Sequence, residues 1–101
     1  MEIKEASIEV DERIKQYGGY WGPLSMFARL AEEVGEVGRA MNVKLGRKRK
    51  KSDDDGRELS EELADVFFTI LAICNSLGID LEKEFILKNK KSHEKYKEVY
   101  E

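Results

Sequence analysis

The spacing of apolar residues along the chain predicts four helices and no strands. Aliphatic and aromatic side chains recur every three or four positions, which places them on one face of an α-helix. Glutamate, lysine, leucine and alanine favour helices and are abundant, whereas proline occurs once. The expected helices span about residues 3–16, 24–45, a third that starts at 58–60 and ends near 78, and 81–100, and Ser60 suits the cap of the third. We therefore expect an all-α, four-helix bundle and a single domain over residues 1–101.

Turn and capping residues mark the ends of these helices. A glycine-rich turn that includes Gly18 and Gly19 follows the first helix, and Pro23 suits the first turn of the second. Gly78 suits the C-terminal end of the third helix, and Asp80 suits the N-cap of the fourth. Residues 46–57 combine a basic run with serine, aspartates and glycine but hold no apolar anchor, so a mobile loop is expected there.

The second and third helices each carry a pair of acids beside an apolar stripe. Glu33 falls roughly 80° and Glu36 roughly 140° from the centre of the second helix's stripe. Glu62 and Asp65 fall at roughly the same angles, on the same side, around the third helix. Residues three apart are neighbours on a helix surface, so the four carboxylates converge if the two helices pack as a hairpin. The stripes comprise Phe27, Leu30, Val34, Val37, Met41 and Leu45, and Leu59, Leu63, Val66, Ile70, Ile73 and Leu77.

Four converging carboxylates predict a site for a hard divalent cation. Carboxylates at short range raise one another's pKa, and a divalent cation removes that cost. Neither cysteine nor histidine lies near these acids, and oxygen ligands alone favour Mg²⁺ or Mn²⁺ over Zn²⁺. Because Mg²⁺ often takes its remaining ligands from phosphates, the acids point to phosphate chemistry. The alternative is that they are ordinary charges on a solvated helix face.

The third helix predicts a second copy of the chain. It is apolar almost all round from Leu63 to Leu77, and such a helix needs cover on every side. One bundle of 101 residues does not provide that cover, so we infer a second chain on the side of Phe68. Asp65 would then be partly buried, where a carboxylate without a partner is costly. The alternative is that Phe68 is a single exposed aromatic residue.

Composition limits the binding partners and the cellular setting to be expected. The 18 basic and 21 acidic residues give a net charge of -3, which provides no reason to expect nucleic-acid binding. The N-terminus lacks an apolar signal core, and no apolar stretch has the length of a membrane span, so no membrane partner is expected. A single cysteine, Cys74, excludes an internal disulfide and favours a reducing, cytoplasmic setting.

The order of the acidic motifs resembles that of a known family. Glu32-Glu33-Val34-Gly35-Glu36 followed by Glu62-Leu63-Ala64-Asp65 is similar to the EExxE…ExxD signature of MazG-like nucleotide pyrophosphohydrolases, within the all-α NTP pyrophosphatase superfamily. The flanks Trp21-Gly22-Pro23-Leu24 and Leu77-Gly78-Ile79-Asp80-Leu81 are similar as well. The last helix, with Lys88-Asn89-Lys90-Lys91, resembles the family's Lys/Asn/Arg-containing helix, so that the resemblance covers about residues 21–91.

The resemblance implies a MazG-like bundle and a nucleotide substrate. It implies hydrolysis of an NTP or dNTP, canonical or damaged, to the monophosphate and pyrophosphate. It implies Mg²⁺ held by Glu33, Glu36, Glu62 and Asp65, with Glu32 or Glu33 orienting the attacking water. It also implies a homodimer or a dimer of dimers, so that dimerisation completes the bundle. The alternative function is a non-catalytic helical dimer that senses a nucleotide or binds a partner protein.

Four further residues are candidate substrate contacts. The fourth helix is expected to turn a stripe through Phe85 and Tyr96 inwards, and Asn89 lies on this inner face, where a polar group needs a partner. It is expected to touch carboxylates or phosphate, or else to bond to backbone. Lys88 and Lys91 are candidate phosphate ligands, although a solvated face also explains each lysine alone. Trp21 is a candidate for stacking on a base, with closure of the core as the alternative.

Overall fold

The computed structural model describes residues 1–45 and 58–100, and this part of the chain is all-α. The loop expected at residues 46–57 therefore lies outside the described residues. The predicted helix ends agree with the structure to within one or two residues. The helices are α1 (Ile3–Gln16), α2 (Pro23–Lys44), α3 (Glu58–Leu77) and α4 (Leu81–Tyr100).

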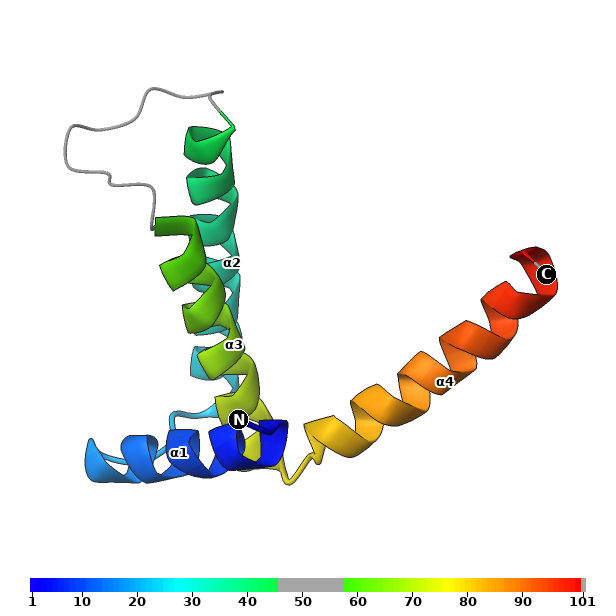
Figure 1. The fold of residues 1–101 in the computed structure, drawn as a ribbon. Coiled ribbons are helices and arrows are strands. Elements are labelled where there is room, and N and C mark those ends of the chain that lie inside the picture. Colours follow the sequence, from blue (N-terminus) through cyan, green and yellow to red (C-terminus); the bar gives the residue numbers. More distant parts are fainter. Residues whose placement is uncertain (46–57, 101) are drawn as a thin grey trace.

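Helices α2 and α3 form an antiparallel hairpin, and α1 crosses one end of it (Figure 1). Within the described residues, α4 has its main contacts with α1, and it projects away from the hairpin. The fold is therefore a hairpin with one crossing helix and one extended arm. The expected all-α class is confirmed, but α4 does not lie alongside α2 and α3 in a single chain.

The junction between α3 and α4 explains the direction of the arm. Gly78 has a φ of +69°, the left-handed conformation that commonly ends a helix. The backbone N–H of Ile79 donates to the carbonyl of Cys74 at 2.8 Å, which completes this C-terminal motif. Asp80 then caps α4, because its carboxylate accepts the backbone N–H of Lys83 at 3.1 Å. The two helices meet at 107° as a result.

The core lies where α1 crosses the base of the hairpin. Val10, Met26, Leu71 and Ala72 form the buried cluster, and Leu71 is 1% exposed. Full burial of one such leucine contributes about 1.5–3 kcal/mol. Asn75 adds a polar link, because its side-chain amide donates to the backbone carbonyl of Ser7 at 2.8 Å. The position of α1 is thus fixed by both apolar packing and a hydrogen bond.

The face that α2 presents to its neighbours differs from the predicted stripe. Met26, Glu33 and Ala40, seven residues apart, are buried. Phe27 and Val34, expected in the core, are exposed. Met41 and Leu45 are exposed as well. Helix α2 is rotated so that its acidic positions face α3, which leaves four of the six residues of the predicted apolar stripe exposed within one chain.

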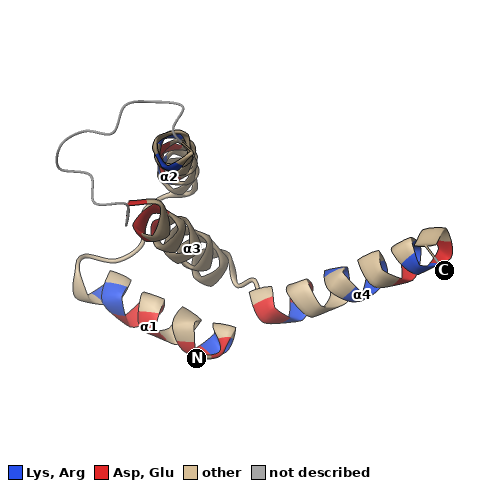
Figure 2. Cartoon of the chain, turned by 45° about the horizontal axis from the view of Figure 1, so that its top comes forward, with Lys and Arg blue, Asp and Glu red and all other residues tan. Residues whose placement is uncertain are grey.

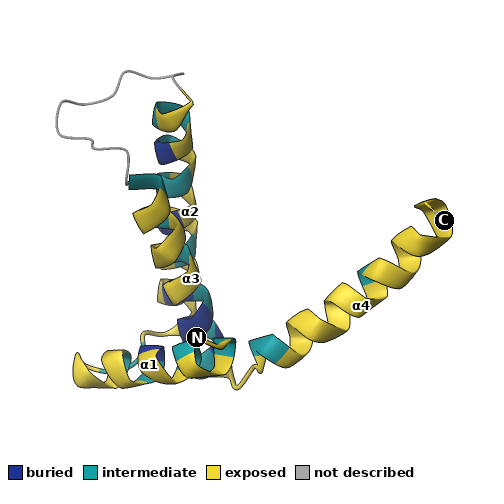
Figure 3. Cartoon of the chain, in the orientation of Figure 1, coloured by how far each residue is buried: buried dark blue, intermediate teal, exposed yellow. Residues whose placement is uncertain are grey.

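Helix α3 is only partly covered, and α4 is covered even less. Leu63, Phe67 and Phe68 of α3 are exposed, which agrees with its predicted lack of cover in a single chain. The stripe predicted to face inwards on α4 is wrong for the single chain, because Phe85 is 60% exposed and α4 has no buried residue (Figure 3). Tyr96 and Val99 are exposed too.

The described helices were expected not to cross a membrane. No single helix in these ranges is long and apolar enough to cross a membrane. Helices α3 and α4 reach the length and apolar composition of a membrane-spanning segment only when they are taken together, across their sharp bend.

A tyrosine–aspartate pair joins the glycine-rich turn to α1. The hydroxyl of Tyr20 donates to the carboxylate of Asp11, which also pairs with the Lys15 ammonium at 3.0 Å. The hydrogen bond from Tyr20 lowers the pKa of Asp11, and Lys15 adds to this effect. Loss of solvation and the bond to Asp11 raise the pKa of Tyr20 to about 12. The pair therefore favours a neutral phenol beside an ionised carboxylate.

Replacement of Tyr20 by Phe should change stability at high pH. The folded chain raises the tyrosine pKa from 10.0 to about 12, so the stabilisation is complete below about pH 10 and is lost as pH rises towards 12. Tyr20→Phe should remove this loss and flatten the unfolding midpoint between pH 10 and 12. Absorbance titration at the phenolate band should lose its most alkaline step. An unchanged alkaline step would contradict the pairing with Asp11.

Candidate metal and nucleotide site

Carboxylates from α2 and α3 converge in the middle of the hairpin. Oxygen atoms of Glu33, Glu62 and Asp65 lie within 4.8 Å of one another. Oxygen atoms of Glu36, Glu58 and Glu62 do the same. Every acid predicted to bind metal therefore belongs to one of two groups, and Glu62 belongs to both. We call these five residues the carboxylate cluster.

Glu58 is a member of the cluster that sequence reasoning missed. Within the described residues its Oε2 atom is buried and accepts no hydrogen bond, although its other oxygen pairs with Arg39. A buried carboxylate oxygen without a partner is costly, and a cation would satisfy it. The available signal was the spacing, because Glu58 precedes Glu62 by four residues and shares its helix face.

Glu33 is the buried member of the cluster, and the burial expected for Asp65 depends on a second chain, so the single chain does not test it. Glu33 is 7% exposed, whereas Asp65 is exposed in the single chain. The reason is the rotation of α2, which places Glu33 between the helices. Arg29 compensates this burial, because its Nε lies 2.9 Å from Glu33 Oε1. A buried carboxylate thus has one guanidinium partner one helical turn away.

The cluster carries more negative than positive charge. Arg39 pairs with Glu36 at 3.3 Å and with Glu58, across the two helices. Two guanidinium groups thus face five carboxylates, so that three negative charges are in excess. Loss of solvation and the charges of the surrounding acids raise the pKa of Glu62, against a smaller opposing effect of Arg39. The donor set is oxygen alone, and it fits a hard divalent cation.

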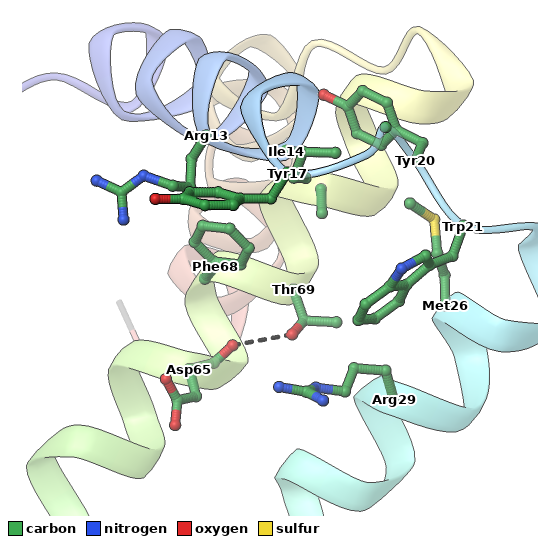
Figure 4. A pocket seen from close by; sticks show the side chains of 12 residues that line it. Arg13, Ile14, Tyr17, Tyr20, Trp21, Met26, Arg29, Asp65, Phe68 and Thr69 are labelled. Carbon is green, nitrogen blue, oxygen red and sulfur yellow. Dashed lines mark hydrogen bonds between the residues drawn. The ribbon is translucent and has the colours of Figure 1, made fainter.

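An apolar pocket lies beside the cluster, between α1, the glycine-rich turn and the hairpin (Figure 4). Its volume is about 200 Å³. Asp65 belongs both to the pocket wall and to the cluster. Arg29 lies over the ring of Trp21, with its guanidinium carbon 5.6 Å from the ring centroid. The lining residues are Arg13, Ile14, Tyr17, Gly19, Tyr20, Trp21, Met26, Arg29, Asp65, Phe68, Thr69 and Ala72.

A threonine hydrogen bond and three aromatic side chains shape this pocket. Thr69 donates a hydrogen bond to the backbone carbonyl of Asp65 at 2.9 Å, which points its methyl group towards the apolar side. Tyr17 and Phe68 lie together at the end nearest α1, and Trp21 lies opposite (Figure 4). The pocket therefore offers flat apolar walls next to a charged end, a combination suited to a nucleobase next to phosphates.

The other predicted site residues lie outside the carboxylate cluster. Trp21 borders the pocket, as its proposed role requires. Glu32 is exposed and lies outside the cluster, in a shallow hollow that shares Trp21 and Arg29 with the pocket. Lys88, Asn89 and Lys91 are exposed on α4, and within one chain the structure does not bring this part of α4 to the cluster (Figure 1).

Comparison with known families identifies the chain. A model of the MazG nucleotide pyrophosphohydrolase domain matches residues 22–100. The chain belongs to the MazG family. Among curated proteins, YpjD of Bacillus subtilis strain 168 is 44% identical over 82 residues, which cover 80% of this chain and 74% of YpjD. The resemblance inferred from the acidic motifs is therefore confirmed.

Solved structures of MazG-type proteins share the fold. The crystal structure of YpjD from Bacillus subtilis matches with a TM-score of 0.81 and 40% identity, over 90% of this chain and 94% of YpjD. A Bacillus-conserved MazG protein, described as a nucleotide pyrophosphohydrolase, matches with a TM-score of 0.73 and 41% identity, over 89% and 88%. This MazG chain is a hydrolase that acts on acid anhydrides, which favours the enzymatic prediction over the non-catalytic alternative.

Proposed function

We propose that this MazG chain hydrolyses nucleoside triphosphates, ribo or deoxy and canonical or damaged, to the monophosphate and pyrophosphate. The observation that carries the proposal is the convergence of five carboxylates next to an apolar pocket, with Asp65 shared by both. A nucleotide has the same two parts, because its flat base adjoins a chain of phosphates. Family membership supports cleavage of a phosphate anhydride.

Mg²⁺, with Mn²⁺ as a substitute, is the proposed cofactor. Glu33, Glu36, Glu62 and Asp65 are the proposed ligands, and the buried free oxygen of Glu58 extends this set. When bound, the cation would contact phosphate oxygens and neutralise charge that develops at the α–β bond. Arg29 pairs with Glu33, and Arg39 pairs with Glu36 and Glu58, so these guanidinium groups would hold the three carboxylates in place when a nucleotide binds.

A carboxylate of α2 is the proposed base. Water adds to the α-phosphorus, the bond from that phosphorus to the bridging oxygen breaks, and pyrophosphate leaves with the electron pair. The proton from water passes to a carboxylate within hydrogen-bond reach. Glu32 and Glu33 are the candidates, and Glu33 is the one that the cluster contains. The exposed position of Glu32 in one chain favours Glu33 for this role.

The pocket is the proposed base site, and a second copy is the proposed partner. Trp21 and Phe68 offer apolar walls for a base next to the phosphate end at Asp65. Exposed Val34 and Phe67 are among the apolar side chains that a homodimer, or a dimer of dimers, would cover. Substrate contacts of Lys88, Asn89 and Lys91 then depend on how that second copy is placed.

Pyrophosphate release tests the proposal. The purified chain should release one pyrophosphate per nucleotide from at least one member of a panel of NTPs, dNTPs and oxidised nucleotides, and chelation of Mg²⁺ should stop the reaction. Glu36→Ala and Asp65→Ala should each lower the rate by at least about 100-fold, by analogy with loss of groups that hold a catalytic metal. Full activity in either variant, with unchanged activity in the α1 control Glu12→Ala, would contradict the proposed site.

Mg²⁺ and a non-hydrolysable NTP should also raise the thermal unfolding midpoint. A ligand that binds only the folded state at 100 times its Kd adds about 2.7 kcal/mol. For a domain of this size that corresponds to a shift of roughly 10 °C or more. Glu36→Ala and Asp65→Ala should reduce the shift caused by Mg²⁺. An equal shift in these variants would place the cation elsewhere.

A further inference from the structure

Arg29 touches both halves of the proposed site. Its guanidinium carbon lies 5.6 Å from the centroid of the Trp21 ring, in the wall of the apolar pocket. Its Nε lies 2.9 Å from Oε1 of Glu33, a member of the carboxylate cluster. The side chain of Arg29 is 47% exposed, so a bound molecule can reach it. Arg29 therefore joins the pocket to the cluster and is accessible where they meet.

The terminal amino groups of Arg29 point into the junction of pocket and cluster. The contact with Glu33 is made through Nε, and most N–H donors of a guanidinium lie on its terminal amino groups. Figure 4 shows the guanidinium directed from α2 across the pocket towards Asp65. Arg13, another guanidinium of the pocket wall, lies at the opposite end beside Tyr17 (Figure 4). Arg29 is thus the arginine of the pocket wall that faces the cluster.

The α-phosphate is the part of a nucleotide that would lie at this junction. Base, sugar and α-phosphate follow one another, so a base in the pocket places the α-phosphate nearest to Arg29 among the phosphates. Acidic residues gather at the start of α3, next to α2 (Figure 2), and the cluster keeps three negative charges in excess with both of its arginines counted. Phosphate oxygens are repelled there unless N–H donors face them. Arg39 lies between Glu36 and Glu58 and is not part of the pocket wall, so Arg29 is the arginine placed for this contact.

We infer that the terminal amino groups of Arg29 bind the non-bridging oxygens of the α-phosphate and stabilise the charge that accumulates there during hydrolysis. The inference rests on the proposed function, because it assigns a contact to the same substrate. The guanidinium stays protonated, so it donates hydrogen bonds and transfers no proton. Its Nε remains bonded to Glu33, which fixes the guanidinium in place before the substrate binds. The planar fork of an arginine fits two phosphate oxygens at once.

Binding of a nucleoside and of its 5′-monophosphate tests this contact without hydrolysis. Only the monophosphate has the α-phosphate. Both are measured by calorimetry with Mg²⁺, using the base that gives the fastest pyrophosphate release or, if none is released, the largest thermal shift. In Arg29→Ala the Kd of the monophosphate should rise at least about tenfold, and that of the nucleoside should change less than about twofold. Lys44→Ala, which removes an exposed cation from the end of the same helix, should change neither Kd. An equal rise for both ligands, or no rise for the monophosphate, would overturn the inference.

Mg²⁺ alone separates a phosphate contact from an indirect role through Glu33. In Arg29→Ala, pyrophosphate release should fall by at least about 100-fold, as when one donor to a developing charge is removed. The rise in unfolding midpoint that Mg²⁺ causes without nucleotide should be at least as large as in the wild type, because the lost guanidinium no longer competes for Glu33. If Arg29 only held Glu33 for the cation, this rise would shrink together with the activity, as expected for Glu36→Ala. A smaller rise in Arg29→Ala would therefore overturn the inference.

Arg29→Lys covers the case in which Arg29→Ala does not fold. A lysine keeps a positive charge beside the buried Glu33, so this variant should unfold close to the wild-type midpoint. An ammonium lacks the planar fork, so hydrolysis should still be at least about tenfold slower. A wild-type rate in Arg29→Lys would overturn the inference. If the wild-type chain released no pyrophosphate, the proposed function would fail, and the comparison of nucleoside with monophosphate would still decide whether Arg29 contacts the phosphate.

Discussion

Replacement of Glu62 by Gln is expected to lower Mg²⁺-dependent hydrolysis by at least about 100-fold and to leave the fold intact. Glu62 is the residue that both groups of converging carboxylates share, so the loss of its charge weakens both groups. Without metal, Glu62→Gln removes a carboxyl group whose pKa is raised by lost solvation and by the neighbouring acids. The unfolding midpoint without Mg²⁺ should therefore stay the same or rise, while the stabilisation by Mg²⁺ should shrink.

Two measurements separate this expectation from general damage. Pyrophosphate release gives the loss of activity, and thermal unfolding with and without Mg²⁺ gives the loss of metal binding. Glu12→Gln on the exposed side of α1 is the matched control, and both quantities should stay at the wild-type level. A Glu62→Gln variant that unfolds earlier without metal would show that the carboxylate stabilises the hairpin. That result would argue against a site held open for a cation.

Replacement of Leu71 by Ala is expected to cause the largest loss of stability. Leu71 is 1% exposed and packs where α1 crosses the hairpin. Removal of a buried leucine side chain costs about 2–5 kcal/mol, because transfer energy is lost and a cavity is left. In a domain of this size the unfolding midpoint should fall by roughly 10 °C or more. Denaturant unfolding monitored by circular dichroism gives the free energy directly.

Leu24→Ala is the matched control for this loss. It removes the same atoms from a side chain that is 84% exposed, so its effect should stay within about 0.5 kcal/mol. Equal effects of the two substitutions would mean that the core does not lie where α1 crosses the hairpin. Leu71→Ala should also loosen the pocket, because its neighbour Ala72 lines both the core and the pocket wall.

The helices and the acids were predictable because local chemistry decides them. Gly78 and Asp80 mark the boundary of α3 and α4 by backbone conformation and capping, and both effects act within a few residues. Helix periodicity placed Glu62 and Asp65 on one side of α3, and the structure brings them to Glu33. Glu58 was missed only because the acids were considered as pairs three residues apart.

The partner of each apolar face was not predictable from periodicity. The stripe through Phe27, Val34 and Met41 is a property of the sequence, but what covers it depends on tertiary packing. In this fold, α2 and α3 present carboxylates to each other and leave apolar side chains outside. The same limit applies to α4, where the stripe through Phe85 was expected to face inwards and is exposed.

The bridge made by Arg39 bears on how far the length of the 46–57 connection can vary. Arg39 lies five residues before the end of α2 and joins Glu36 to Glu58, the first residue of α3, so contacts between described residues hold the start of α3 against α2 without help from the 46–57 connection. The entropy of closing a chain segment grows slowly, by about 0.6 kcal/mol for each doubling of its length. Insertions in this connection should therefore be inexpensive, and relatives can differ greatly there while their carboxylates keep the same register.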